Sequence, residues 1–536
     1  MAESLRKGKE PRACLCLVLH AHLPYVRHPE YKEYLEEDWF FEAMTETYLR
    51  LADLCSRLEE DRVPFRMSLS ITPTLLEMLR DPLLLDRFER RLGKLSRLSE
   101  LEEERTRGKS ALHKAAWFYV DFFRRIQALY HDLAGRDLVG YFALQAEGGN
   151  LEILGSAATH AVLPLLGTDA GRRAQIRSGR RIYRRHLGKA PAGFWLPECG
   201  YSQGLDRILA GEGITHFFLE STSLLLGEPG PIHGTWAPVA TPGGPVAFAR
   251  DPRVARRVWG AREGYPGHPV YREFYRDLAF DGEKEYLEEF LHSDGVRRPL
   301  GIKYHRVTGL VPLYEKETWD PEAARRQARI HAKEFVEQVL REAAGRERPG
   351  GAPPLVTATF DAELFGHWWF EGPWFVEELF REMAHRNWEL EPVTPGEWLE
   401  RYDPPQVVQP EAGTWGAGSN FSTWLNPDNA WIWRHLRLAE KDMARVVAEN
   451  RKSHGPIRRA LDQALRELLL AQSSDWPFIM TRRTMVAYAV RRFRVHIHSF
   501  RTLLKCVEGG VVDGARLSEL EERHPFGQGV DYRDFA

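Results

Sequence analysis

Short runs that are apolar on both faces alternate with amphipathic segments over the first three quarters of the chain. The apolar runs are residues 13–20, 65–71, 150–154, 193–196, 215–219, 246–250 and 356–361. Helical spacing lies between them, as in residues 40–58, 172–187 and 203–211. Continuously apolar runs of this length are typical of buried parallel strands, so the alternation predicts an α/β fold built on a parallel sheet.

Two regions depart from this alternation. Residues 83–126 are polar, charged and helical in spacing, with a break at Gly108, and they predict an inserted helical hairpin. From about residue 399 onward the strand pattern stops and helical spacing dominates. We therefore expect an α/β domain of residues 11–82 and 127–398, a helical domain inserted at 83–126, and a C-terminal all-helical domain at 399–536.

The composition narrows the choice of partners. The 536 residues carry a formal net charge of −2, so we expect binding neither to nucleic acid nor to an anionic membrane. The 16 tryptophans fit stacking on flat, uncharged sugar rings, although a large core also accommodates tryptophan. The five scattered cysteines predict neither a disulfide framework nor a zinc pattern, and apolar runs are too short to span a membrane. These features favour a cytoplasmic location.

Two of the apolar runs lead into a carboxylate with aromatic neighbours, Glu198 and Asp361. Chemistry in α/β barrels sits at the carboxyl ends of the strands, so both side chains are expected in one cleft. Breaking a glycosidic bond requires two carboxyl groups, one on each side of the bond. The alternative for each residue is a carboxylate that caps a loop or pairs with an arginine.

Histidines give a second candidate site. His20 and His22 alternate at the end of the first apolar run, so both point to the same side if the strand continues. With His160, His367 and a strand-end aspartate they could hold a zinc ion. Equally, all four could donate hydrogen bonds to sugar hydroxyls, and the residue pattern does not decide between these alternatives.

The segments around these residues resemble the signature regions of glycoside hydrolase family 57, and within it those of the α-1,4-glucan branching enzymes. The five matching segments are 20–25 (HAHLPY), 155–160 (GSAATH), 195–201 (WLPECGY), 360–369 (FDAELFGHWW) and 424–426 (WLN). Segments 258–259 with 264–267, and 474–478, are similar to further signatures of the branching-enzyme group. The matches cover residues from about 15 to about 480, nearly the whole chain.

The resemblance implies an incomplete (β/α)7 barrel with an inserted helical domain and a C-terminal helical domain. It implies a retaining mechanism without metal or other cofactor, with Glu198 as the nucleophile and Asp361 as the acid/base. The expected substrate-binding residues are His20, His22, His160, Trp259, His367, Trp424, Trp433 and Asp475. The expected reaction cleaves an α-1,4 linkage of an amylose-like or glycogen-like glucan and forms an α-1,6 linkage, as in glycogen biosynthesis.

Other functions stay open. The family also contains α-amylases and 4-α-glucanotransferases, and branching enzymes carry a loop tipped by a tyrosine over the active site. The corresponding residues 225–245 are rich in Gly and Pro and predict a loop or lid. They contain no tyrosine, so His233 or Trp236 would have to take the position of the tyrosine at the loop tip. A zinc-dependent carbohydrate deacetylase or mannosidase is a further alternative, as is a catalytically inactive glucan-binding protein.

Overall fold

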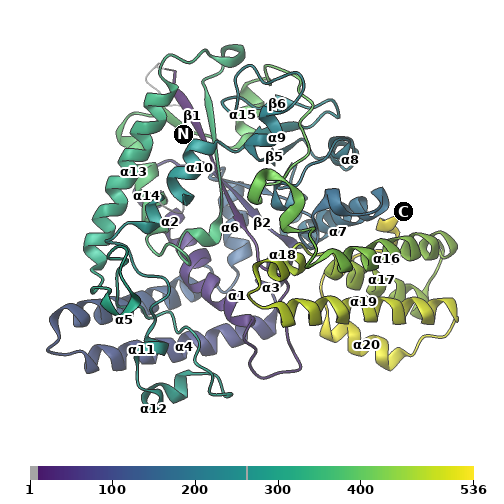
Figure 1. The fold of residues 1–536 in the computed structure, drawn as a ribbon, viewed down its shortest axis with the longest axis horizontal. Coiled ribbons are helices and arrows are strands. Elements are labelled where there is room, and N and C mark those ends of the chain that lie inside the picture. The colour runs from purple at the N-terminus through teal and green to yellow at the C-terminus, as the bar shows by residue number, and fades with distance from the viewer. Residues whose placement is uncertain (1–9, 261–262) are drawn as a thin grey trace.

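The computed structural model describes residues 10–260 and 263–536, in which the strands form two sheets (Figure 1). The first sheet has the order β3-β2-β1-β8, with β9 also paired to β1. Its strands are β1 (Ala13–Ala21), β2 (Met67–Ile71), β3 (Leu151–Leu154), β8 (Leu355–Asp361) and β9 (Leu390–Pro392). The second sheet has the order β4-β5-β7-β6. Its strands are β4 (Gly193–Phe194), β5 (His216–Leu219), β7 (Val246–Ala249) and β6 (Val239–Ala240). The predicted α/β fold with a parallel sheet is confirmed.

The pairing is parallel throughout, except where β6 runs antiparallel to β7. Every residue of β1 is buried, because helices cover one face and the second sheet faces the other, and this explains its continuously apolar sequence. Each predicted apolar run contains a strand. Strands β6 and β9 were not predicted, because two or three residues are too few to leave a periodic signal.

The register of the first sheet brings polar residues together at the carboxyl ends of its strands. His20 of β1 is paired with Ser70 of β2 on one side and with Asp361 of β8 on the other. Partners in a parallel ladder project to the same face, so the three side chains share one end of the sheet. The two sheets are also linked at both edges. Gly155 forms a parallel bridge with Phe194, and the backbone N–H of Asp251 donates to the carbonyl of Thr357 at 2.8 Å.

Helices cover the sheets. They are α1 (Glu37–Ala43), α2 (Leu49–Glu60), α3 (Pro73–Met78), α6 (Leu138–Glu147), α7 (Asp169–Leu187), α8 (Leu205–Gly211), α9 (Ser221–Leu225), α10 (Pro252–Trp259), α13 (Pro321–Ala343), α14 (Gly372–His385) and α15 (Pro395–Arg401). Local sequence fixes their ends. In α7, the Thr168 side chain accepts a hydrogen bond from the N–H of Gly171, and Gly188 ends the helix with a φ of 73°.

The predicted helical hairpin is formed by α4 (Pro82–Arg105) and α5 (Ser110–Ala128), which pack side by side at the lower left of Figure 1. Residues 263–320 extend onto this hairpin with little regular structure beyond α11 (Leu278–Asp281) and α12 (Lys284–Leu287). The Tyr119 hydroxyl donates to the carbonyl of Lys303 at 3.0 Å, and the Tyr304 hydroxyl donates to Glu102 at 2.8 Å. Part of the predicted α/β range 127–398 therefore packs with the insertion.

The last part of the chain is helical and lies at the right of Figure 1. It contains α16 (Ala430–Glu449), α17 (Gly455–Ala471), α18 (Asp475–Arg482), α19 (Val486–Glu508) and α20 (Gly514–Arg523). The residue before α18 reaches the loop that follows β3, because the backbone N–H of Ser474 donates to the carbonyl of His160 at 3.2 Å. Within the described residues, none of the helices is both long and apolar enough to cross a membrane.

Candidate active site

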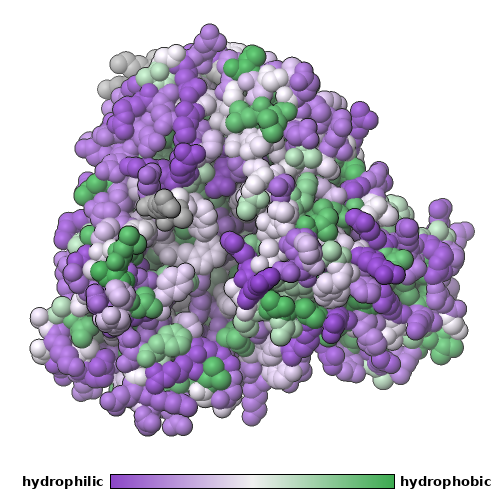
Figure 2. All heavy atoms as spheres, in the orientation of Figure 1, coloured by the Kyte–Doolittle hydropathy of each residue, from purple (hydrophilic) through white to green (hydrophobic). Residues whose placement is uncertain are grey.

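A cavity of about 540 Å³ lies where β1 and β8 end. In Figure 2 the middle of the visible face is hollowed, and pale residues of intermediate hydropathy gather there among the purple charged ones. Nine predicted site residues line the cavity: His20, His22, His160, Glu198, Trp259, Asp361, His367, Trp424 and Asp475. Trp433 does not line it. Its indole is 4% exposed and donates to the carbonyl of Trp424 at 2.8 Å, so it supports the cavity wall and does not face a ligand.

Glu198 is held in a strained and well-anchored position. It lies in a 3₁₀ turn (Pro197–Cys199) with φ 60° and ψ 23°, a left-handed conformation that costs a residue with a side chain on the order of 1 kcal/mol. Trp415 Nε1 donates to one carboxylate oxygen at 2.8 Å, and Ser474 Oγ donates to the other at 2.9 Å. Burial raises the pKa of Glu198 to about 7, although these hydrogen bonds favour the ionised form.

Asp361 has a different environment. It is the last residue of β8, and among the described residues no group donates a hydrogen bond to its carboxylate. Burial raises its pKa to about 6, while the positive charges of Arg250 and His22 lower it. The charge on Asp361 in turn raises the pKa of Glu198, so the two carboxyl groups interact across one cavity.

Three side chains connect Glu198 to the first sheet by hydrogen bonds. Ser474 Oγ lies 2.8 Å from His160 Nδ1, His160 Nε2 lies 2.9 Å from His20 Nε2, and His20 Nδ1 lies 3.0 Å from Ser70 Oγ. Burial lowers the pKa of both histidines, so they are neutral. Because Ser474 donates to Glu198, His160 must donate through Nδ1, His20 through Nε2, and Ser70 through its hydroxyl. All four donors therefore point toward the nucleophile candidate.

His22 differs from these two histidines. Its ring stacks on His160 with centroids 3.8 Å apart, and its Nε2 lies 3.1 Å from Asp475 Oδ1. Although burial alone lowers the pKa of His22, the charge and hydrogen bond of Asp475 raise it above the ordinary value. His22 therefore holds a proton more readily than an ordinary histidine, on a ring that lines the cavity with Glu198 and Asp361.

Glu363 is a further cavity carboxyl, beside Glu198, Asp361 and Asp475, and sequence reasoning missed it. It accepts hydrogen bonds from the Tyr48 hydroxyl and from the backbone N–H of His22, the latter at 3.1 Å. Burial, together with the charge of Asp361, raises its pKa to about 7. Tyr48 comes from a π-helical segment (Met44–Tyr48) that separates α1 from α2, where the spacing had predicted one continuous helix. The position of Glu363, two residues after Asp361, was the available signal.

Three further tryptophans of the cavity wall were not predicted as site residues: Trp39, Trp368 and Trp415. Trp415 contacts Glu198 twice, since its backbone N–H also donates to the Glu198 carbonyl at 3.0 Å. Trp368 is 41% exposed and meets Trp259, which is 45% exposed, with ring centroids 5.5 Å apart. Trp424 is only 1% exposed, so Trp259 and Trp368 offer the accessible ring surface.

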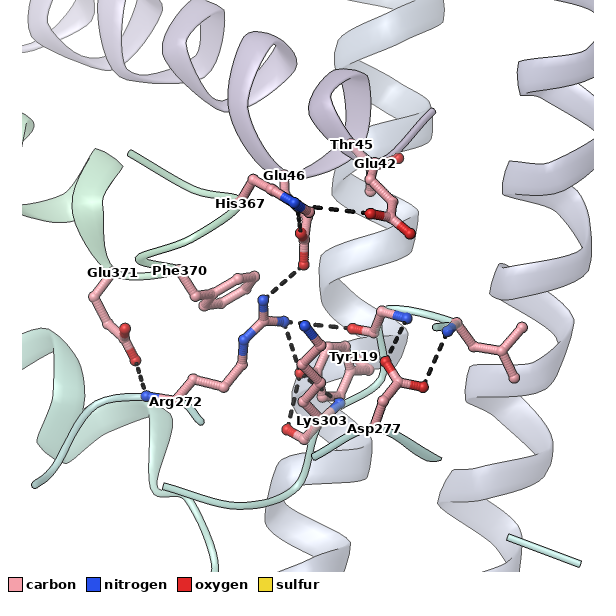
Figure 3. A network of polar contacts seen from close by, with 12 residues as sticks. Glu42, Thr45, Glu46, Tyr119, Arg272, Asp277, Lys303, His367, Phe370 and Glu371 are labelled. Carbon is pink, nitrogen blue, oxygen red and sulfur yellow. Dashed lines mark hydrogen bonds and ion pairs between the residues drawn. The ribbon is translucent and has the colours of Figure 1, made fainter. Parts of the chain in front are cut away.

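His367 is positioned by a buried charge network (Figure 3). Its Nδ1 lies 2.9 Å from Glu46 Oε2, and Glu46 Oε1 accepts from Arg272 at 2.7 Å. The Arg272 guanidinium also lies 3.9 Å from the ring centroid of Phe370. Gly366 makes this approach possible: its φ is +125°, and a Cβ there would lie 1.8 Å from the Glu46 carbonyl oxygen.

The metal alternative depended on the cavity histidines. Within residues 10–260 and 263–536, the three potential ligand residues that lie close enough together to hold a metal ion are Glu467, His496 and His524, and none of them lines the cavity. It lies in the helical C-terminal part, and both histidines already share the Glu467 carboxylate through hydrogen bonds of 2.7 and 2.8 Å. The facing Nε2 atoms of His20 and His160, 2.9 Å apart, share a proton and do not offer two free lone pairs.

The cavity thus contains carboxyl groups, histidines and tryptophans at the ends of parallel strands. This arrangement is typical of an α/β protein of the glycosidase type. Sequence profiles refine this class. The profile described as glycosyl hydrolase family 57 matches residues 16–410, and that described as the C-terminal part of 1,4-α-glucan branching enzyme matches 435–535. The chain belongs to glycosyl hydrolase family 57.

Solved structures agree with this assignment. An α-amylase of Thermotoga maritima is 40% identical, with a TM-score of 0.89 and coverage of 98% of this chain and 99% of that one. A branching enzyme of Pyrococcus horikoshii is 32% identical, with a TM-score of 0.87 and coverage of 98% and 97%. The 1,4-α-glucan branching enzyme of Thermococcus kodakarensis is 34% identical over 96% of this chain and 77% of its own length. Relatives with two different activities are therefore similar over nearly the whole chain.

Proposed function

We propose that this protein is a 1,4-α-glucan branching enzyme that acts by retaining double displacement. The observation that carries the proposal is the unequal pair of carboxyl groups in one cavity: Glu198 with two hydrogen-bond donors, and Asp361 with none among the described residues. The C-terminal profile match and the relatives from Thermococcus and Pyrococcus support the same activity.

The fold favours a barrel. We propose that β1, β2, β3, β4, β5, β7 and β8 form an incomplete (β/α)7 barrel. The Gly155–Phe194 bridge joins the two sheets at one edge, and the hydrogen bond from Asp251 to Thr357 joins them at the other. We propose residues 83–126 as the inserted domain and residues 399–536 as the helical domain, which contributes Trp415, Trp424 and Asp475 to the cavity lining.

The proposed chemistry requires Glu198 ionised and Asp361 protonated. Both pKa values are raised, that of Asp361 to about 6 and that of Glu198 to about 7, so without a glucan Asp361 loses its proton first. A glycosidic oxygen beside Asp361 accepts its proton in a hydrogen bond and so favours the protonated form there. Glu198 keeps its two donors, so glucan binding selects the productive state.

In the first step Glu198 attacks the anomeric carbon, the α-1,4 bond breaks, and Asp361 gives its proton to the leaving oxygen. A covalent glucosyl–enzyme forms. In the second step the ionised Asp361 takes the proton from the 6-hydroxyl of an acceptor glucan, whose oxygen attacks the anomeric carbon. The ester to Glu198 breaks and an α-1,6 branch is released.

Hydrolysis is the second candidate, and two observations favour it. The α-amylase of Thermotoga maritima is 40% identical to this chain, which exceeds the 32% of the branching enzyme from Pyrococcus. Residues 225–245 also contribute no side chain to the cavity lining, and Trp236 is buried away from it at 3% exposure. The loop is therefore not the predicted lid, and neither His233 nor Trp236 takes the place of a covering tyrosine.

Product analysis separates the two reactions. Amylose is incubated with the protein, and α-1,6 linkages are measured by proton NMR together with reducing ends. New α-1,6 linkages support branching, whereas reducing ends that rise without them support hydrolysis. Glu198→Gln should lower either activity by at least about 10³-fold, because a carboxamide is not a nucleophile. Activity of Glu198→Gln within tenfold of the wild type contradicts the catalytic assignment.

A further inference from the structure

A second cavity, of about 750 Å³, lies between the loop of residues 29–38, helix α4 and residues 290–293. Its lining carboxylates and its lysine and arginine side chains are nearly equal in number. Four aromatic residues line it: Tyr31 and Tyr34, and the buried Phe41 and Phe290. Tyr31 is 44% exposed, and its ring lies 4.9 Å from that of Tyr34, which stacks on His28 at 3.8 Å. A polar cavity without strong net charge and with an exposed aromatic ring suits a neutral, hydroxyl-rich ligand.

The walls of this cavity are fixed before any ligand arrives. Arg87 of α4 donates to the Glu37 carboxylate at 2.6 Å and to the Tyr31 carbonyl, so the helix holds the loop. On the other side, His292 Nε2 lies 2.8 Å from Asp38 Oδ2. A wall held from three parts of the chain loses little conformational entropy on binding.

Aromatic contacts connect this cavity with the catalytic one. Trp39 lines the catalytic cavity, and its ring centroid is 6.0 Å from that of Tyr488. Tyr488 is 6.2 Å from Tyr34, which lines the second cavity. The two cavities therefore lie on either side of one aromatic wall.

We propose that the second cavity binds a stretch of α-glucan chain outside the catalytic cavity, with Tyr31 stacking on a glucose ring. This inference rests on the proposed function, since branching brings a donor chain and an acceptor chain to one enzyme. A long or branched glucan can occupy both cavities at once, whereas a short oligosaccharide fills only one. Tyr31 thereby raises affinity for polymeric glucan through effective concentration.

The test uses the full-length Glu198→Gln protein, in which the ligand is not consumed. Dissociation constants for glycogen and for maltotriose are measured with and without Tyr31→Ala. We expect the constant for glycogen to rise about tenfold and that for maltotriose to change less than twofold. Tyr31→Phe keeps the ring and should bind glycogen like the parent. Tyr314→Ala is the matched control, because Tyr314 is 76% exposed and lines neither cavity.

Unchanged glycogen binding by Tyr31→Ala overturns the inference, and so does an equal loss for both ligands, which would mean that Tyr31 acts through the catalytic cavity. Failure of the proposed function has a different signature. In that case the wild-type protein leaves amylose unchanged, whatever the Tyr31 variants do.

Discussion

The hydrogen bond from Trp415 to Glu198 provides a sharp test of how the site sets its protonation. Trp415→Phe removes the Nε1–H that lies 2.8 Å from Glu198 Oε2 and keeps most of the aromatic packing. A hydrogen bond to a charged group contributes about 1.5–3 kcal/mol, and about 1.4 kcal/mol corresponds to one pKa unit. The pKa of Glu198, already raised to about 7, should therefore rise by a further one to two units, roughly.

The assay is kcat/KM on amylose between pH 4.5 and 10. The productive state has Glu198 ionised and Asp361 protonated, and because the pKa of Glu198 (about 7) lies above that of Asp361 (about 6), the limb at higher pH follows Glu198. That limb should move up by about one to two units, and activity at pH 6 should fall about 10- to 100-fold. Trp369→Phe is the control, since Trp369 is 1% exposed and its Nε1 makes no hydrogen bond among the described residues. A limb at higher pH that stays within about 0.3 units refutes the reasoning, even if overall activity falls.

Three further predictions follow from the site. Burial raises the pKa of Glu198 from 4.5 to about 7, so ionising this carboxyl group lowers the stability of the folded protein as pH rises between these values. In urea unfolding, Glu198→Gln should be more stable than wild type by up to about 3 kcal/mol at pH 8 and no more stable at pH 4. Equal stability of the two proteins at both pH values contradicts this prediction. Asp475→Asn should lower the pKa of His22, measured by NMR of the ring protons, because the neighbouring charge is lost; an unchanged value contradicts the pairing. Trp259→Ala should raise KM for amylose about tenfold with a smaller effect on kcat, whereas Trp117→Ala, which removes an even more exposed indole outside the cavity, should change neither.

Much of the site could be predicted because its chemistry lies at strand ends. Asp361 ends β8, and His20 lies next to the end of β1, so the apolar runs pointed directly to them. Glu198 follows β4 closely, but its strained backbone and its two donors left no mark in the local pattern. The sequence therefore indicated both candidate carboxyl groups. It did not indicate the hydrogen-bond donors and backbone conformation that distinguish the proposed nucleophile from the proposed acid/base.

Other residues could not be found in this way. Trp415 lies in a stretch without helical or strand periodicity, and its contact with Glu198 spans 217 positions of the chain. Trp433, in contrast, was predicted to contact sugar because it lies in an aromatic, helical segment. In the structure its indole is buried and donates a hydrogen bond to the carbonyl of Trp424. Periodicity reports which face of an element is buried, but it does not report which distant segment covers that face.

The sequence by itself determined the α/β alternation, the helical insertion, the helical C-terminal part and the positions of Glu198 and Asp361 at or near strand ends, because each depends on residue order over a few turns or strands. Only the tertiary structure decided that Trp415 and Ser474 donate to one carboxylate and that the other has no donor among the described residues. The reason is physical: pKa values and hydrogen bonds depend on burial and on neighbours brought together by loop closure, which local pattern does not encode.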